Sequence, residues 1–275
     1  MPSPESRVRF WRELTAPEIR AAAPRAVAVL PLAATEQHGP HLATGTDALL
    51  NELLQRGLAE SPPPRGELVI LPTVPLGASE HHTPFGGTLS APPILYTRML
   101  AAMLRGLLAQ GHTRIFALNS HGGNEAPLAT ALAEIAAECT RRGVLVGGAS
   151  YWTICGPHWR TEIPDLKQPT VGHAGEIETS MLMAARPDLV PGPPPPDCPF
   201  PDHESSGWNA ALSFPAFTAH GHIGAPAAAS AEKGRRLFAI AVRELGRFFA
   251  DFSQRPLPRD RRSDPGSAGA AEPAS

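Results

Sequence analysis

The chain has 275 residues and a formal net charge of -2. This length suits one large α/β domain or two small ones, with enough residues to bury a sizeable core. The near-neutral charge and the scattered Lys and Arg residues exclude the basic surface of a nucleic-acid-binding protein. No apolar run reaches the length of a membrane span, and the first fifteen residues lack the pattern of a signal peptide. We therefore expect no membrane partner.

Strand-like and helix-like segments alternate along the first half of the chain. A short helix is expected within residues 10–24, with Thr15 as its N-cap. Continuous apolar runs then predict buried strands at 26–34, 67–77, 114–120 and 144–152. Polar loops follow the first three strands, and amphipathic helices are expected after these loops, at 47–60, 95–111 and 126–143. The alternation predicts an α/β fold with a mainly parallel sheet and helices on both faces.

The pattern is less regular after Trp152. A long loop is expected first, followed by a helix at 176–185 that ends before Pro187. The Pro-rich segment 191–204 is expected to be extended, and 231–252 reads as a long amphipathic helix. The composition of 254–275 is typical of disorder, which leaves 1–253 as the expected domain.

The three cysteines suggest a reduced protein. Cys139, Cys155 and Cys198 are odd in number, and their spacing matches no metal or redox motif. We expect buried thiols and a cytoplasmic location.

Four polar loops carry histidine, and three of them carry a carboxylate within the loop proper, whereas the Glu of the remaining one begins the helix that follows. They are TEQHGPHLATGTD (35–47), GASEHHTPFGG (77–87), NSHGGNE (119–125) and GHAGEIETS (172–180). Sites in open parallel sheets form beyond the carboxyl ends of the strands, so these loops are expected to converge there. Convergence would assemble Glu36, His38, Asp47, His121 and a Glu of the last loop. This mixed set suits Zn, Mn or Fe, and Asp47 could bridge two ions that activate a shared water.

Each loop also has a simpler structural interpretation when it is taken alone. Glu36 and His38 project to one side of an extended segment, whereas Gln37 points away. Asp47 could instead cap the helix that follows it, and Asn124 could cap the next one. It is the combination of the loops at one sheet edge that favours a metal-dependent hydrolase.

Together, TEQHGPHLATGTD, NSHGGN and GHAGEIETS resemble the signature blocks of the creatininase (creatinine amidohydrolase) family, and GASEHHTPFGGTLS and GHIGAPAAASAEKGRRL (221–237) resemble further blocks. The resemblance implies a three-layer α/β/α fold, a homo-oligomer that is often a hexamer, and two divalent metal ions. By position, it implies metal ligands at Glu36, His38, Asp47 and His121. His173 matches the histidine that passes protons to the leaving nitrogen, Glu178 matches the glutamate five residues beyond it, and Trp152 matches a tryptophan of the substrate pocket. His41 is not expected to be a ligand.

Three positions depart from creatininase itself. A ligand glutamate of that enzyme is replaced by Gly123, a neighbouring aromatic residue by Gly122, and a second pocket tryptophan by Pro169. We expect Glu178, or less favourably Glu176, to replace the missing ligand and Glu178 also to orient His173. Glu80 and His81 are expected to face the substrate or support the site, although a solvated turn would also explain them. His173 could be a supporting hydrogen-bonding residue, and Trp152 a core residue.

Three functions remain open from the sequence. The first is a metal-dependent amidohydrolase that cleaves a C–N bond in a small cyclic or linear amide, using a water activated by two metal ions, with Zn expected and Mn or Fe as alternatives. The second uses the same centre as a peptidase of mycofactocin maturation or as a formamide deformylase. The third is a non-catalytic scaffold of the same fold.

Overall fold

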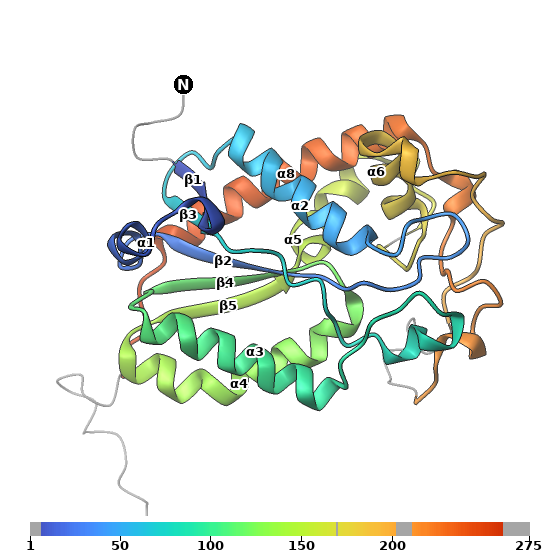
Figure 1. Cartoon of the computed structure of the whole chain (residues 1–275). Coiled ribbons are helices and arrows are strands. Elements are labelled where there is room, and N and C mark those ends of the chain that lie inside the picture. Colours follow the sequence, from blue (N-terminus) through green and yellow to red (C-terminus); the bar gives the residue numbers. More distant parts are fainter. Residues whose placement is uncertain (1–6, 169, 202–210, 261–275) are drawn as a thin grey trace, which may run out of the picture.

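The computed structural model describes residues 7–168, 170–201 and 211–260 (Figure 1). At its centre is a five-stranded sheet in which every strand pair is parallel, in the order β1-β3-β2-β4-β5. The strands are β1 (Arg7–Phe10), β2 (Val27–Leu32), β3 (Glu67–Ile70), β4 (Arg114–Asn119) and β5 (Leu145–Ser150). The predicted parallel sheet is confirmed, but β1 was not predicted, because four residues give too short a pattern to recognise.

Helices cover both faces of the sheet and produce the expected three layers (Figure 1). They are α1 (Ala16–Ala22), α2 (Thr46–Glu60), α3 (Pro93–Ala109), α4 (Glu125–Arg142), α5 (Tyr151–Glu162), α6 (Glu176–Ala185) and α8 (Ala231–Gln254). α3 and α4 pack on one face, whereas α2, α5, α6 and α8 pack on the other. Alternation along β2 explains this division. Val27 and Val29 pack against α2, α5, α6 and α8, whereas Ala28 and Leu30 pack against α3 and α4.

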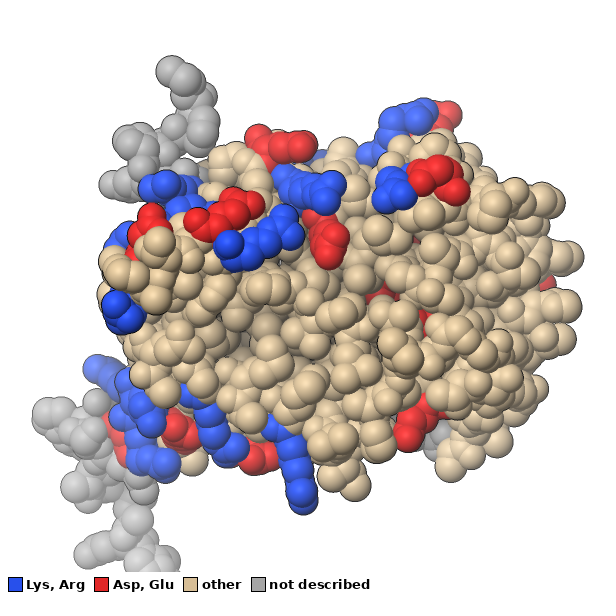
Figure 2. Space-filling model, viewed as in Figure 1, with Lys and Arg blue, Asp and Glu red and all other residues tan. Residues whose placement is uncertain are grey.

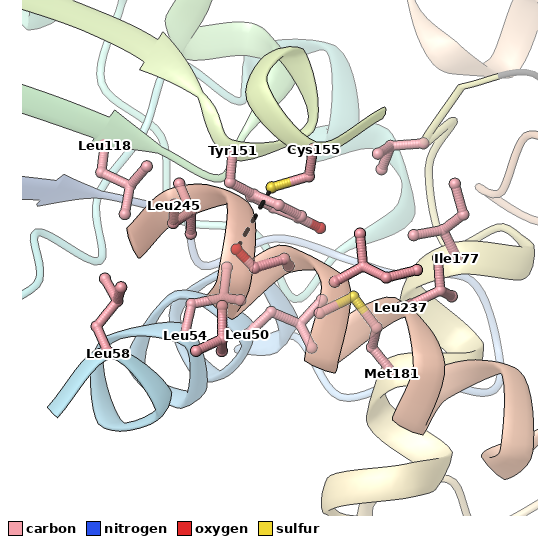
Figure 3. Close-up of a cluster of buried hydrophobic side chains, with 14 of the residues drawn as sticks. Leu50, Leu54, Leu58, Leu118, Tyr151, Cys155, Ile177, Met181, Leu237 and Leu245 are labelled. Atoms are coloured by element: carbon pink, nitrogen blue, oxygen red, sulfur yellow. Dashed lines mark hydrogen bonds between the residues drawn. The ribbon is translucent and has the colours of Figure 1, made fainter. Parts of the chain in front are cut away.

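The prediction of a long loop after Trp152 is wrong, because helix α5 begins at Tyr151 and continues to Glu162. Gly156 and Pro157 make this segment a poor helix by propensity. The helix is stabilised by burial, since Tyr151, Cys155 and Trp159 recur every four residues on one face. The indole N–H of Trp159 donates to the carbonyl of Leu237 in α8 at 3.0 Å, and Figure 3 shows the same face packed around Tyr151 and Cys155.

The C-terminal helix α8 runs two residues beyond its predicted end, so Gln254 is helical rather than part of a tail. The structure describes the chain to residue 260, and the rest of the predicted tail lies outside the described residues. Residues 202–204 of the Pro-rich segment also lie outside them. Within the described part of that segment, Cys198 forms two backbone hydrogen bonds with Gly224.

The surface carries interspersed charges of both signs on the face shown in Figure 2, and its right-hand side, over the loops, is mostly uncharged. Among the described residues, no helix combines the length and apolarity needed to cross a membrane.

The crossing of α6 and α8 depends on a glycine. A Cβ atom built on Gly234 would lie closer than 3.0 Å to the carbonyl group of Ser180, which is a backbone group that cannot move aside. Lys233, next to it, donates to Glu176 Oε1 at 2.6 Å, and this carboxylate is fully buried. Since α6 begins at Glu176, the close approach at Gly234 and the bond from Lys233 together fix the position of the loop before α6.

Gly234→Ala should therefore destabilise the protein by more than about 2 kcal/mol, although alanine is the better helix former. Gly246→Ala is the matched control in the same helix, because its Cβ would meet only Pro63, at 4.0 Å. The control should be neutral or stabilising by up to about 1 kcal/mol. Urea unfolding measures both changes, and equal effects of the two substitutions would contradict the role of Gly234.

Candidate metal centre

The polar loops meet at the carboxyl edge of the sheet, as the alternating pattern predicts. Loop 35–47 follows β2, loop 77–90 follows β3, and His121 follows β4. The fourth loop reaches the same place in the turn before α6. Its position is held by an antiparallel bridge between His173 and Ile223, made of two backbone hydrogen bonds of 3.0 and 2.8 Å.

Two groups of side chains that share Asp47 lie at this edge. In the first, Nδ1 of His121 is 3.0 Å from Oε1 of Glu36 and 3.3 Å from Oδ2 of Asp47. In the second, Nε2 of His38 is 3.2 Å from Oδ1 of Asp47 and 4.0 Å from Oε1 of Glu178. The ligand atoms within each group all lie within 4.8 Å of one another. The two oxygens of Asp47 therefore face different groups, which is the arrangement of a bridging carboxylate.

Hydrogen bonds on the outer side fix which nitrogen of each imidazole can bind a cation. Nδ1 of His38 lies 3.1 Å from the backbone carbonyl of Glu36, so this nitrogen carries the proton. In His121, Nε2 lies 3.1 Å from the Ser79 hydroxyl and 3.3 Å from the carbonyl of Ala78. The lone pairs of His38 Nε2 and His121 Nδ1 then point at the carboxylates, as in metal sites whose outer hydrogen bonds set the tautomer.

The inner atoms of these groups lack ordinary partners. Among the described residues, both carboxylate oxygens of Glu36, Oδ2 of Asp47 and Nε2 of His38 are buried and without a hydrogen bond. All five candidate ligands are at most 3 % exposed. Buried carboxylates facing imidazole lone pairs are costly unless a cation lies between them, so the residues present fit bound metal ions.

The carboxylates also dominate the electrostatics of the site. Burial opposes a charge on His38, but Asp47, Glu178 and Glu36 outweigh it and raise the pKa of His38 to about 10. Burial raises the pKa of Glu178 to about 8, even though His38 lies beside it. Burial alone would raise the pKa of Asp47, yet His38 and His121 hold this pKa below its usual range. Without metal ions, the site therefore draws protons to balance its negative charge.

The capping alternative is wrong for Asp47, because Gly45 is the N-cap of α2 and Asp47 lies within its first turn. Asn124 is the N-cap residue of α4, as that alternative predicts, but its side chain makes no capping hydrogen bond. Its amide oxygen accepts from the N–H of Ala78 at 3.0 Å, and its amide nitrogen donates to the carbonyl of Ala33 at 3.2 Å. Asn124 therefore holds the second and third loops against the end of β2.

The two glutamates at the start of α6 have different surroundings. Glu176 accepts from Lys233 and from the backbone N–H of Lys167, at 2.6 and 2.7 Å, and lies outside both groups. Glu178 faces Asp47 and His38, and its Oε2 accepts from the N–H of Ala174 at 2.7 Å. Ala174 has a φ of +50°, a costly conformation for a residue with a side chain. The strained turn orients Glu178 toward the site.

Gly123 leaves no room for the glutamate of creatininase itself. A Cβ atom at this position would lie closer than 3.0 Å to the carbonyl of Ala78 and to the ring of His121. A Cβ at Gly122, in contrast, would meet nothing within 4 Å, and Gly122 lines the cavity beside the site. Gly122 thus leaves the pocket open, and Gly123 removes a ligand position.

His173 is oriented differently from our expectation. Its Nδ1 lies 3.5 Å from Oε1 of Glu36, and its Nε2 lies 2.8 Å from the backbone carbonyl of Gln37. The expectation that Glu178 orients this ring is therefore wrong, because a backbone carbonyl does so. Burial, together with the neighbouring His38, lowers the pKa of His173 well below its ordinary value.

His82 was missed by the sequence interpretation. Its ring stacks on that of His173 with centroids 4.2 Å apart, and its Nε2 lies 3.4 Å from Oε1 of Glu36. Burial lowers the pKa of His82, as does the proximity of His173. The pair EHH in the second loop was the available signal, but nothing in the letters shows which histidine turns inward.

A cavity of about 340 Å³ opens onto the candidate ligands. Trp152, in the first turn of α5, and His81 both line it, as expected. Glu80 is exposed and lies outside the cavity lining, so the structure does not place it at the site. His41 bonds to the Thr179 hydroxyl at 3.0 Å instead of facing the ligands. Pro169 lies outside the described residues.

Comparison with known proteins agrees with this geometry. A mycofactocin precursor peptide peptidase of Mycolicibacterium smegmatis (strain ATCC 700084 / mc(2)155) is 32 % identical over 222 residues, which are 78 % of this chain and 80 % of that protein. A creatinine amidohydrolase of Pseudomonas putida is 27 % identical over 202 residues, covering 66 % of this chain and 71 % of that protein.

The fold matches solved structures as well. A crystal structure of creatinine amidohydrolase (creatininase) superimposes with a TM-score of 0.74 at 26 % identity and covers 90 % of this chain and 98 % of that one. The family model for creatininase, described as creatinine amidohydrolase, matches residues 12–249. Because this match includes strands β2 to β5 and all four site loops, the chain belongs to the creatininase family.

Proposed function

We propose that the chain is a metal-dependent amidohydrolase that cleaves an amide C–N bond with the help of two divalent cations. Glu36, Asp47 and His121 would hold one cation, and His38, Asp47 and Glu178 the other. The observation that carries the proposal is that Asp47 joins two groups of buried ligand atoms that lack other partners. Bound cations would lower the pKa of a shared water and polarise the amide carbonyl, and this ligand set suits Zn, Mn or Fe.

His173 would transfer the proton. Its Nε2–H donates to the carbonyl of Gln37, so its Nδ1 faces Glu36 with a free lone pair. Burial keeps this ring neutral at rest, since its pKa is lowered. The ring can then accept the proton that the water loses and deliver it to the nitrogen of the leaving amine, which is general acid–base catalysis.

We infer that the substrate is a peptide rather than a small cyclic amide. The relative at 32 % identity is named as a precursor peptide peptidase. The cavity beside the ligands is continued by a second one of about 250 Å³, and Trp152, Thr170 and Val171 line both. Two adjoining cavities offer room for chain on either side of a cleaved bond, and Gly122 enlarges the first. A small amide or a formamide is the alternative substrate for the same centre.

A substrate panel tests this function. The purified protein, loaded with Zn, Mn or Fe, should release fragments from short peptides and leave creatinine, hydantoins and formamides largely unchanged, as measured by mass spectrometry. A chelator should abolish the activity, and added metal should restore it. Turnover of creatinine or a formamide in preference to every peptide would overturn the peptide inference but retain the amidohydrolase.

Metal analysis tests the two-ion site and separates an enzyme from a scaffold. The wild type should retain about two equivalents of divalent metal, and Glu178→Gln about one, because a neutral amide is a poor replacement for a carboxylate ligand. Glu176→Gln is the matched control in the same turn. Its amide oxygen can still accept from the N–H of Lys167, so the turn before α6 should stay in place and both ions should be kept. Stability should fall by about 3 kcal/mol, because Lys233 loses its charged, buried partner.

Less than one equivalent in the wild type would argue for the non-catalytic scaffold. Equal metal contents in the two glutamate variants would contradict the assignment of Glu178 as a ligand.

His173→Gln should lower kcat by about 10²- to 10⁴-fold, which is the contribution expected of a general acid–base residue. Metal content should stay at the wild-type value. His158→Gln is the control, since its half-exposed ring pairs with Glu244 on the surface, away from the cavity. Steady-state kinetics on the cleaved peptide measure the change, and wild-type turnover by His173→Gln would remove His173 from the mechanism.

A further inference from the structure

Gln37 lies between Glu36 and His38 in the strand-to-helix loop, and it is buried. Its Oε1 accepts the backbone N–H of Gly39 at 2.9 Å, and its Nε2 donates to the carbonyl of Gly221 at 2.7 Å. A backbone N–H can only donate and a carbonyl can only accept. These two partners therefore determine which end of the amide is nitrogen.

The amide nitrogen has two further neighbours, Nδ1 of His82 at 2.8 Å and Nε2 of His173 at 3.2 Å. Nε2 of His173 is closer to the carbonyl of Gln37, at 2.8 Å, so the second N–H of the amide is left for His82. Because the amide nitrogen donates, this Nδ1 must accept, and the neutral ring of His82 must carry its proton on Nε2. That N–H faces Oε1 of Glu36 at 3.4 Å. His82 thus presents a donor to a candidate metal ligand.

The backbone of the same residue determines the proton of His173. The carbonyl of Gln37 accepts from Nε2 of His173 at 2.8 Å, which leaves a lone pair on Nδ1, 3.5 Å from the same oxygen of Glu36. The two stacked imidazoles therefore present opposite hydrogen-bonding groups to the same carboxylate. His82 presents an N–H, and His173 presents a lone pair.

We propose that Gln37 is a positioning residue that sets the proton positions of His82 and His173, with His82 donating toward Glu36 so that only His173 is free to take up the proton. This inference rests on the proposed function. The bond from Gln37 prevents His82 from offering a second basic nitrogen at the cavity.

The backbone at Gly221 leaves room for the amide of Gln37 only because this glycine has no side chain. A Cβ atom at Gly221 would lie closer than 3.0 Å to Oε1 of Gln37, and Gly221 has a φ of +75°. The segment that begins at Gly221 continues to Ile223, which pairs with His173. Gln37 therefore connects the first loop, the second loop and the turn before α6 through one side chain.

The test exchanges the donor of this amide for an acceptor without changing its shape. In Gln37→Glu, His82 should move its proton to Nδ1 and lose its N–H toward Glu36. Proton positions can be read by ¹⁵N NMR of histidine-labelled protein, with His82 and His173 assigned by loss of their signals in His82→Gln and His173→Gln. We expect the Nε2–H form for both rings in the wild type, and the Nδ1–H form for His82 in Gln37→Glu.

Kinetics on the cleaved peptide give the second readout. Gln37→Glu should lower kcat by about 10- to 100-fold, the range for outer hydrogen-bond partners of a metal site, with metal content and KM nearly unchanged. His82→Gln can still present an N–H at the position of Nε2 and should retain more activity than His82→Asn, whose amide is too short. In the double variant that combines Gln37→Glu with His82→Gln, kcat should fall by less than the product of the two single fold-decreases.

An Nδ1–H form of His82 in the wild type would overturn the inference, and so would wild-type kcat in Gln37→Glu. The NMR measurement needs no turnover, because the two histidine variants serve only to assign the signals. A wild type that binds metal but cleaves no amide would refute the proposed function, while the proton positions would still decide the role of Gln37.

Discussion

Three carboxylates are buried side by side at the carboxyl edge of the sheet, and the rest of the site is arranged around their charge. Glu36, Asp47 and Glu178 are almost fully enclosed, and the imidazoles of His38 and His121 are the basic groups directly between them. Burying carboxylates so close together is costly unless positive charge lies among them. The outer hydrogen bonds of both histidines leave lone pairs facing inward, which favours cations over protons as that charge.

A replacement within the family's ligand pattern is physically consistent here. Creatininase itself has a glutamate where this chain has Gly123, and the backbone at that position has no room for a side chain. Glu178 instead reaches Asp47 and His38 from the start of α6. The cost of this arrangement is visible in the positive φ of Ala174, whose N–H holds the second oxygen of Glu178. The neighbouring Gly122 leaves the cavity beside the site open.

The support for Glu178 comes from the packing of helices far from the sheet edge. Glu176 is anchored by Lys233, and α8 approaches α6 closely because Gly234 lies at the contact. The indole of Trp159 in α5 donates to Leu237 in α8, and Figure 3 shows Tyr151, Cys155 and Leu237 among the side chains buried between these helices. A candidate metal ligand on a short helix needs this rigid base, since small displacements would separate it from Asp47.

Much of the architecture was predictable because it depends on local patterns. Apolar runs followed by polar loops and amphipathic helices indicated a parallel sheet, and loops after parallel strands must share one edge. These patterns predict that Glu36, His38, Asp47 and His121 lie together at that edge, as they do in the structure. The short strand β1 and helix α5 were not predicted, because the first is too brief to show a period and the second is stabilised by burial against its propensity.

What the sequence by itself determined was the set of chemical groups and the order of the loops that carry them. Only the tertiary structure decided which neighbour in each pair is used. Glu178 rather than Glu176 faces the site, Glu80 faces solvent, and His82 turns inward beside the expected His81. Gln37, expected to point away from the ligands, instead connects both inner histidines. Adjacent residues differ in direction by the local turn of the backbone, and that turn is set by contacts with distant segments such as Gly221 and Lys233.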